Sequence, residues 1–205
     1  MYKLMILCIF AACNLCQASE FLAKSFKSNF VQEFKSGASG KIKTSSGILF
    51  YQYPGSIRLE VTDPDDSLIY VSNPRKTWYY RPPFIEGEPG ELSVSPKGNT
   101  LVAKFFDSLS SGLKSNKLYS VKMKNSDLYV LSFSKAKIKE IGIKDAALKF
   151  KDSKQLQFEN LEYIDLTYKD KKKVRLKFSQ MVANPKFDNK TFLFEVPANT
   201  NINSN

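Results

Sequence analysis

The residue types that most often carry enzyme chemistry are scarce in this sequence. It contains no histidine, and its three cysteines, Cys8, Cys13 and Cys16, all lie within the first 18 residues. Histidine titrates near neutral pH and is a frequent metal ligand, so acid–base catalysis and metal binding through histidine are excluded. A nucleophilic mechanism would need a serine–lysine pair or paired carboxylates instead.

The densest group of carboxylates has a structural explanation. Asp63, Asp65 and Asp66 surround Pro64, a combination typical of a tight turn rather than of a calcium or acid–base site. The chain also lacks a glycine-rich phosphate loop and a nucleophile elbow. We therefore predict a protein that is not an enzyme and that binds no cofactor and no metal.

The N-terminus predicts export. Lys3 precedes an apolar run over residues 4–12, and Ala18 supplies a small residue at the expected cleavage point. The run is shorter than the roughly 18 apolar residues of a membrane-spanning helix, and it matches a secretory signal. Cleavage after Ala18 would leave residues 19–205 as a single domain without cysteine.

A second interpretation of this segment stays open. Phe10-Ala11-Ala12-Cys13 resembles a bacterial lipobox, with phenylalanine where an aliphatic residue is usual. Cys13 would then become the lipid-modified N-terminus, and the protein would be anchored to a membrane instead of soluble.

Composition indicates one folded domain with a basic surface. The chain has 205 residues, of which 42% are hydrophobic and 13% aromatic, and a net charge of +11. This apolar content excludes global disorder, and the length fits one domain. The charge makes nucleic acid, acidic lipid or an acidic protein possible partners. Export and the lack of a nucleic-acid-binding signature argue against nucleic acid.

Alternation of apolar and polar residues predicts strands along most of the chain. We expect them near residues 48–53, 57–61, 68–71, 77–80, 119–123, 128–133, 141–150, 164–168, 174–178 and 192–194. Residues 26–34 fit either a helix face or a strand, and residues 81–98 are expected to form a long surface loop. Ten or eleven short strands with hairpin-length turns predict an antiparallel sheet large enough to curl.

One or two helices are expected beside this sheet. Residues 19–25 are a short candidate, and residues 101–113 predict the clearest helix of the chain. In the second, apolar residues recur at intervals of three and four at positions 101, 102, 105, 106, 109 and 113.

Several strands are apolar or aromatic on both faces, as in residues 48–53. In an ordinary antiparallel sheet one face is polar. A curled sheet can use the extra apolar face to line a cavity beneath an amphipathic helix. A plain core packed under that helix explains the same pattern, and periodicity does not separate the two.

The basic residues also allow two interpretations. Lys135, Lys137 and Lys139 alternate as they would on one face of a strand, and Lys171–Lys173 lie at a hairpin tip. They predict either a docking surface for acidic lipid headgroups or an acidic partner, or the solvated face of an open sheet whose lysines discourage edge pairing. We favour the second interpretation.

Several segments carry a family resemblance through their order. They are Phe30-Val31-Gln32 within residues 26–34, residues 46–59 around the Pro54 bend, Pro64–Ile69, Trp78–Pro82, Phe84–Glu86, Gly98–Leu101, and Phe192–Phe194 with Pro197. Together they resemble the periplasmic outer-membrane lipoprotein carrier (LolA-like) family of the Gram-negative lipoprotein-sorting pathway. In that family Gly98–Leu101 would begin a lid helix, and Phe192–Phe194 would be the closing strand.

The resemblance implies a β-rich α+β fold, an unclosed β-barrel with a helical lid over a hydrophobic cavity. The cavity would shield the acyl chains of lipoproteins in the periplasm, where each exposed methylene costs about 0.8 kcal/mol. Its implied partners are acylated lipoproteins, an inner-membrane lipoprotein-releasing ABC transporter and an outer-membrane lipoprotein receptor. The implied state is a monomer.

Strand parity and helix periodicity, applied to the fold that the resemblance implies, predict which residues line the cavity. Strand parity assigns to the wall Leu49, Tyr51, Tyr53, Ile57, Leu59 and Val61, and we add Trp78. The inner face of the lid would consist of Leu101, Val102, Phe105, Phe106 and Leu109.

The lid closure differs from the family pattern. An arginine ahead of the proline bend latches the family's lid, and this chain has Tyr53 there. The resemblance therefore implies a latch at Tyr53 or at Arg58, the nearest arginine.

Two other functions remain open: a membrane-anchored lipoprotein acceptor or lipid-binding lipoprotein lipidated at Cys13, and a secreted interaction protein with a filled core.

Overall fold

One curled sheet forms most of the molecule. The computed structural model describes residues 21–36, 40–64, 68–98 and 100–204. Within them twelve strands pair in the order β12-β6-β5-β4-β3-β2-β1-β11-β10-β9-β8-β7. Their bounds are β1 Ser25–Lys35, β2 Ile42–Gln52, β3 Ser56–Asp63, β4 Leu68–Ser72, β5 Thr77–Arg81, β6 Gly90–Ser95, β7 Tyr119–Asn125, β8 Leu128–Phe133, β9 Ile143–Phe150, β10 Leu161–Tyr168, β11 Lys173–Ala183 and β12 Thr200–Ser204.

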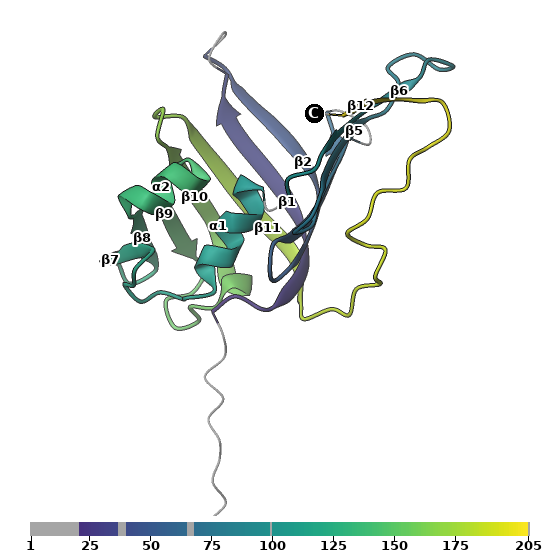
Figure 1. Ribbon diagram of the computed structural model, residues 1–205. Helices are drawn as coiled ribbons and strands as arrows, with labels where there is room; N and C mark the ends of the chain where they lie inside the picture. Colours follow the sequence, from purple (N-terminus) through teal and green to yellow (C-terminus); the bar gives the residue numbers. More distant parts are fainter. Residues whose placement is uncertain (1–20, 37–39, 65–67, 99, 205) are drawn as a thin grey trace, which may run out of the picture.

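The sheet is an unclosed barrel, as Figure 1 shows. All neighbouring strands are antiparallel except β12 and β6, which are parallel. Register shifts between Lys27 and Asn29 and between Ser46 and Gly47 bend the central strands, because a bulge increases local twist. At the second shift the strands approach closely: a Cβ on Gly47 would lie 1.9 Å from the Glu60 carbonyl oxygen. The predicted curled, largely antiparallel sheet is confirmed.

Two α-helices lie on the concave side of the sheet (Figure 1). Helix α1 spans Leu101–Leu109, and the Thr100 side chain accepts a hydrogen bond from the Ala103 N–H at 3.5 Å. This confirms the predicted helix, although it ends four residues earlier than expected. Helix α2 spans Lys135–Ile141, and a short 3-10 turn, η1, spans Phe158–Asn160.

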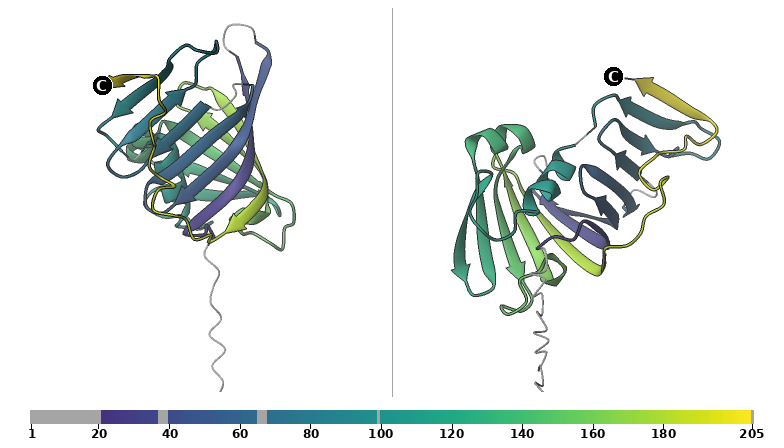
Figure 2. Two further views of the ribbon diagram at one scale, coloured as in Figure 1. Left: turned by 90° about the vertical axis from the view of Figure 1, so that its right-hand side faces the viewer. Right: turned by 60° about the horizontal axis from the view of Figure 1, so that its bottom comes forward.

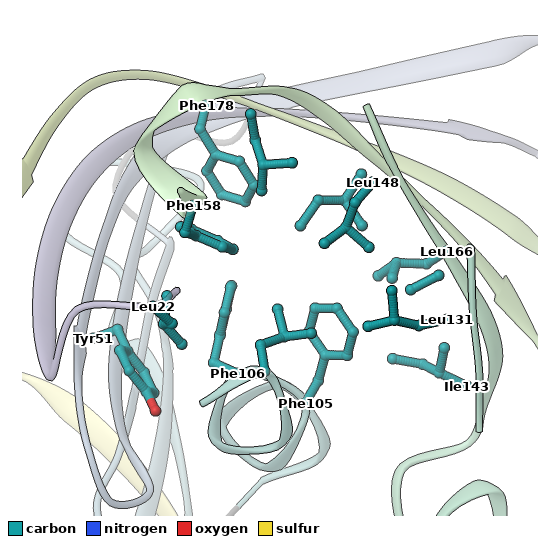
Figure 3. Close-up of a cluster of buried hydrophobic side chains, with 14 of the residues drawn as sticks. Leu22, Tyr51, Phe105, Phe106, Leu131, Ile143, Leu148, Phe158, Leu166 and Phe178 are labelled. Atoms are coloured by element: carbon teal, nitrogen blue, oxygen red, sulfur yellow. The ribbon is translucent and has the colours of Figure 1, made fainter. Parts of the chain in front are cut away.

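The core lies between α1 and the concave side of the sheet. Phe105 and Phe106 of α1 point into a cluster of aliphatic and aromatic side chains from the sheet (Figure 3). Phe106 is 1% exposed, and its ring centroid lies 5.5 Å from that of Phe26 and 5.9 Å from that of Phe158. These two edge-to-face ring pairs hold α1 against β1 and η1.

The alternating lysines lie in a helix and not on one face of a strand. Lys135, Lys137 and Lys139 lie in α2, which Ser134 caps at its start and Gly142 ends in a left-handed conformation with φ of 73°. The apolar positions 138 and 141 are three apart, as one helix face requires. The two helix caps and the three-residue spacing of the apolar positions therefore favour a helix, although the lysines alternate as they would in a strand.

The predicted closing strand at residues 192–194 is also wrong. Residues 184–199 cross the convex face of the sheet, as the left view in Figure 2 shows. Phe194 stacks on Tyr80 at 5.2 Å between ring centroids, and the Asn73 side-chain amide donates to the Phe192 carbonyl at 3.1 Å. The aromatic residues thus anchor a strap, and the last strand is β12.

Two further expectations need correction. The stretch 81–98 is not one loop, because β6 occupies its second half and leaves residues 82–89 as the connection. Residues 21–24 are not helical, and β1 begins at Ser25.

The predicted signal segment, its cleavage after Ala18 and the Cys13 lipobox lie outside the described residues. In the part of the chain that the structure describes, no helix is long and apolar enough to cross a membrane.

Candidate functional site

An apolar cavity of about 230 Å³ lies between α1 and the concave face. We call it the lid cavity. Strands β1 to β3 and β9 to β11 form its walls, and both helices contribute side chains. Its lining residues are Phe30, Gln32, Ser45, Leu49, Leu59, Val61, Leu101, Val102, Phe105, Phe106, Ile141, Ile143, Leu166, Tyr168, Val174, Leu176 and Phe178.

A second, more open hollow of about 720 Å³ continues along β3 to β6. We call it the open groove. It shares Leu59, Val61, Leu101 and Val102 with the lid cavity, so the two hollows form one trough divided by these side chains. Its remaining lining residues are Leu68, Tyr70, Thr77, Tyr79, Ser95, Lys97, Gly98, Thr100 and Lys104.

The residues assigned from the sequence fall into three groups. Seven of them line the lid cavity: Leu49, Leu59, Val61, Leu101, Val102, Phe105 and Phe106. Tyr51, Ile57 and Leu109 are buried in the adjoining core and are each 0% exposed. Tyr53 is 50% exposed and lines neither hollow.

Trp78 lies on the opposite face of the sheet from the hollows. Its strand neighbours Thr77 and Tyr79 line the open groove, and successive side chains of a strand point to opposite faces. Trp78 instead pairs with Val71 and Val94 on the convex face. The placement of Trp78 in the cavity is therefore corrected.

The lid is held at its C-terminal end by Asp107. The Tyr51 hydroxyl donates to Asp107 Oδ1 at 2.8 Å, and the Gly55 backbone N–H donates to the same oxygen at 3.1 Å. Burial raises the pKa of Tyr51 well above its ordinary value, and the hydrogen bond to the Asp107 carboxylate adds to this. Tyr51 therefore remains a protonated donor throughout the physiological range.

Among the described residues, neither predicted latch residue forms a hydrogen bond or an ion pair with the lid. Tyr53 is half-exposed at the bend. Arg58 pairs with Glu60 at 2.6 Å and donates to the carbonyl oxygens of Thr191 and Leu193 in the strap, each at 3.4 Å. Arg58 points to the convex face because it alternates with Ile57 and Leu59. The hydrogen bonds between α1 and the strand end and bend at residues 51–55 are made instead by Asp107.

Helix α2 braces the other end of the lid. Glu140 accepts a hydrogen bond from Lys137 Nζ at 3.1 Å, and Lys104 Nζ of α1 lies 3.6 Å from the other oxygen. Partial burial by itself would raise the pKa of Glu140, but the Lys137 hydrogen bond and both lysine charges outweigh it and hold the pKa below its ordinary value.

Sequence reasoning missed the half of the lid cavity that comes from β9 to β11. Leu166, Val174, Leu176 and Phe178 line it, and all four belong to alternating patterns recognisable in the sequence. Strand parity applied to these strands would have found them. The contribution of Ile141 depends on α2, which the sequence analysis took for a strand.

The site has the chemistry of a binding cavity. Among the described residues, no three His, Cys, Asp or Glu side chains come close enough together to hold a metal ion. Within the same residues, no buried side-chain polar atom lacks a hydrogen-bond partner. Apart from Gln32, Ser45 and Tyr168, every residue lining the lid cavity is apolar, so it suits an apolar ligand.

Comparisons with known proteins agree with this architecture. A protein from Thermus thermophilus, described as an uncharacterized conserved protein, aligns over 90% of this chain and 92% of that one, with 10% identity and a TM-score of 0.50. At this identity the likeness concerns the fold alone.

Two further solved structures are less similar. A LolA superfamily protein from Nitrosomonas europaea has 11% identity, coverage of 85% and 93%, and a TM-score of 0.49. A putative outer membrane lipoprotein-sorting protein domain from Vibrio parahaemolyticus has 12% identity, coverage of 82% and 89%, and a TM-score of 0.41. No curated protein matches the sequence.

The family model described as outer membrane lipoprotein carrier protein LolA matches residues 22–195. This range contains the lid helix, both hollows and eleven of the twelve strands. The chain therefore belongs to the outer membrane lipoprotein carrier protein LolA family.

Proposed function

We propose that this protein is a periplasmic carrier that shields the acyl chains of lipoproteins on their way from the inner to the outer membrane. The observation that carries the proposal is the apolar lid cavity beneath an amphipathic helix, in a chain of the LolA family. Burying methylene groups in such a cavity is favourable by about 0.8 kcal/mol each. The role needs no covalent chemistry, so the protein is proposed to be a non-enzymatic chaperone.

The size of the lid cavity indicates how cargo would enter. An engineered cavity of about 150 Å³ accommodates a ligand the size of benzene. The lid cavity, at about 230 Å³, is therefore too small for one complete acyl chain. Loading would require α1 to move away from the sheet, which would join the lid cavity to the open groove.

The contacts of α1 suit such a movement. Its buried face is held mainly by packing, and two hydrogen bonds to Asp107 fix its C-terminal end. These bonds can be exchanged for water when the helix lifts. The proposed partners are an inner-membrane ABC transporter that loads the cargo and an outer-membrane receptor that takes it, with a monomer as the working form.

The test is uptake of a triacylated lipopeptide by the exported protein, followed by native mass spectrometry. We expect a one-to-one complex with the lipopeptide and none with the same peptide lacking acyl chains. Equal retention of both peptides, or of neither, would overturn the carrier function and favour a surface-binding protein.

The same mass spectrum tests at which residue the mature chain begins and whether it is acylated. A mass that begins at Ser19 fits the soluble carrier, whereas an acylated Cys13 would indicate a membrane-anchored acceptor with the same fold.

A further inference from the structure

The structure separates the lysines of this chain into groups with different surroundings. Lys137 is 9% exposed and pairs with Glu140, which Lys104 also approaches. These lysines stabilise the packing of the two helices. The lysines in the β1–β2 turn and the β10–β11 turn are exposed instead, and their charges require a different explanation.

The two turns are neighbours. Strands β1 and β11 pair in the middle of the sheet, with Phe34 opposite Val174, so the turn that follows β1 lies beside the turn that precedes β11. The end of β1, the start of β2 and the β10–β11 turn lie at the upper end of the molecule in Figure 1 and in the left view of Figure 2. A hollow of about 540 Å³ lies between them, and its charged lining consists of Lys35, Asp170, Lys171, Lys172 and Lys173.

Positive charge is concentrated here. Residues 35–43 and 169–173 contain seven lysines against one aspartate, a net charge of +6 out of +11 for the whole chain. Asp170 already pairs with Lys172 at 3.1 Å. Within the described parts of the chain, Lys35, Lys171 and Lys173 form no ion pair.

Protection of sheet edges does not explain these lysines. The strands that carry them, β1, β2, β10 and β11, are paired on both sides within the sheet. Lysine discourages edge-to-edge association only where a strand has an unpaired side. Edge protection, which we favoured from the sequence, therefore does not explain the lysines at these turns.

The lysines border the lid cavity. Tyr168 and Val174 line the cavity, and the basic β10–β11 turn connects them directly. Gln32 and Ser45, on β1 and β2, line it from the other side, a few residues from the β1–β2 turn. The upper end of the apolar cavity therefore has a cationic rim.

We propose that Lys35 at the end of β1 and the lysines of the β10–β11 turn dock the protein on an anionic membrane surface, with the phosphates of lipid headgroups as the ligand. Lysine ammonium groups on flexible stems bind phosphate as point charges without a fixed geometry, which suits a fluid array of headgroups. A membrane fits better than an acidic protein because the rim borders a cavity that suits acyl chains. Each lysine near such a surface strengthens binding roughly five-fold.

The test is co-sedimentation of the exported protein, checked by mass to carry no acyl group, with phosphatidylcholine vesicles containing or lacking phosphatidylglycerol. We expect binding only to the anionic vesicles, weakening as salt is raised. The triple variant Lys35→Gln, Lys171→Gln, Lys173→Gln should bind about a hundred-fold more weakly. Absence of binding by the unmodified protein, or unchanged binding by this variant, would overturn the proposal.

A matched control separates docking from general charge. Lys124, Lys151 and Lys154 are exposed and lie at the opposite end of the sheet, near the β7–β8 and β9–β10 turns. Their triple substitution by glutamine removes the same charge and should weaken binding by less than about five-fold. Equal losses in the two triple variants would contradict a specific docking surface.

Orientation on the membrane gives a second measurement. Residues 19–205 contain no cysteine, so a dye can be attached at Ser36→Cys beside the rim or at Ser153→Cys at the opposite end. Anionic vesicles should change the fluorescence of the first label and not of the second; the reverse would place docking on another face. These experiments use no lipoprotein, so docking can fail while acyl binding, and hence the proposed carrier function, is retained.

Discussion

The lid cavity and the open groove share four side chains but differ in what encloses them. The lid cavity is covered by α1, whereas the larger groove is more open to solvent along β3 to β6. The comparison indicates that helix α1, rather than the curvature of the sheet, encloses the lid cavity. A sheet with two usable apolar regions becomes a closed cavity only where α1 packs against it.

The largest expected effect concerns the packing of α1. Phe106→Ala removes a side chain that contacts Phe26, Tyr51, Phe105 and Phe158, and we expect a loss of about 3–5 kcal/mol in the free energy of unfolding. Urea unfolding monitored by circular dichroism measures it.

Leu101→Ala is the matched change on the same helix. Leu101 is 52% exposed at the boundary of the two hollows, so its truncation should cost about 1 kcal/mol or less. Similar losses from both substitutions would mean that α1 is not held by its buried face.

The next prediction tests which hollow receives the acyl chain. Leu176 lines only the lid cavity, and Leu176→Glu would place an unpaired carboxylate against the ligand, with a cost of several kcal/mol. We expect affinity for a fluorescent fatty acid to fall by about a hundred-fold or more, as measured by titration on variants whose melting temperatures show that they are folded.

Ser95→Glu makes the corresponding change in the open groove, because Ser95 lines that hollow and not the lid cavity. A fall of less than about ten-fold is expected, because water still reaches that carboxylate. If Ser95→Glu abolishes binding and Leu176→Glu does not, the assignment of the two hollows is reversed.

A smaller effect is expected from the latch. Tyr51→Phe removes one of the two donors to Asp107, a loss of about 1.5 kcal/mol for a hydrogen bond to a charged group, or roughly ten-fold in lid opening. Hydrogen exchange of the α1 amides and the rate of lipopeptide release should both increase by about this factor.

Tyr53→Phe is its control. Tyr53 is half-exposed, and among the described residues its side chain forms no hydrogen bond with the lid, so both rates should stay unchanged. Faster release from Tyr53→Phe than from Tyr51→Phe would restore Tyr53 as the latch.

The smallest effect concerns the brace between the helices. Glu140→Gln removes the carboxylate shared by Lys104 and Lys137, and because this pair is partly exposed we expect a loss of less than about 1 kcal/mol at neutral pH. The pKa of Glu140 is lowered by folding, so the carboxylate contributes stability above its unfolded pKa of about 4.3, and this contribution is lost as pH falls through the folded value. The difference between the two proteins in thermal unfolding should therefore disappear in acid; a difference that persists there would exclude the ion pairs as its cause.

Much of the site follows from local patterns. Alternation in residues 48–61 assigned Leu49, Leu59 and Val61 to one face, and that face lines the lid cavity. The spacing of apolar residues likewise identified α1 and its inward side. Such predictions succeed because side-chain direction in a regular element depends only on its period.

Other features depend on contacts between distant residues. The alternating lysines of α2 satisfied a strand pattern as well as a helix pattern, and the caps at Ser134 and Gly142 together with the spacing of Ile138 and Ile141 distinguish them. The latch pairs Tyr51 with Asp107 across 56 positions, and the strap at residues 184–199 covers strands that precede it by more than a hundred residues. Neither pairing has a local signal.

By itself the sequence determined the strand-rich class, the amphipathic helix and the apolar face of the central strands, because these depend on composition and on periods of a few residues. Only the tertiary structure decided how much of that apolar surface is covered, which carboxylate holds the lid, and that two basic turns distant in sequence lie side by side. Those outcomes depend on the order of strands in the sheet and on its curvature, which bring together residues that no periodicity relates.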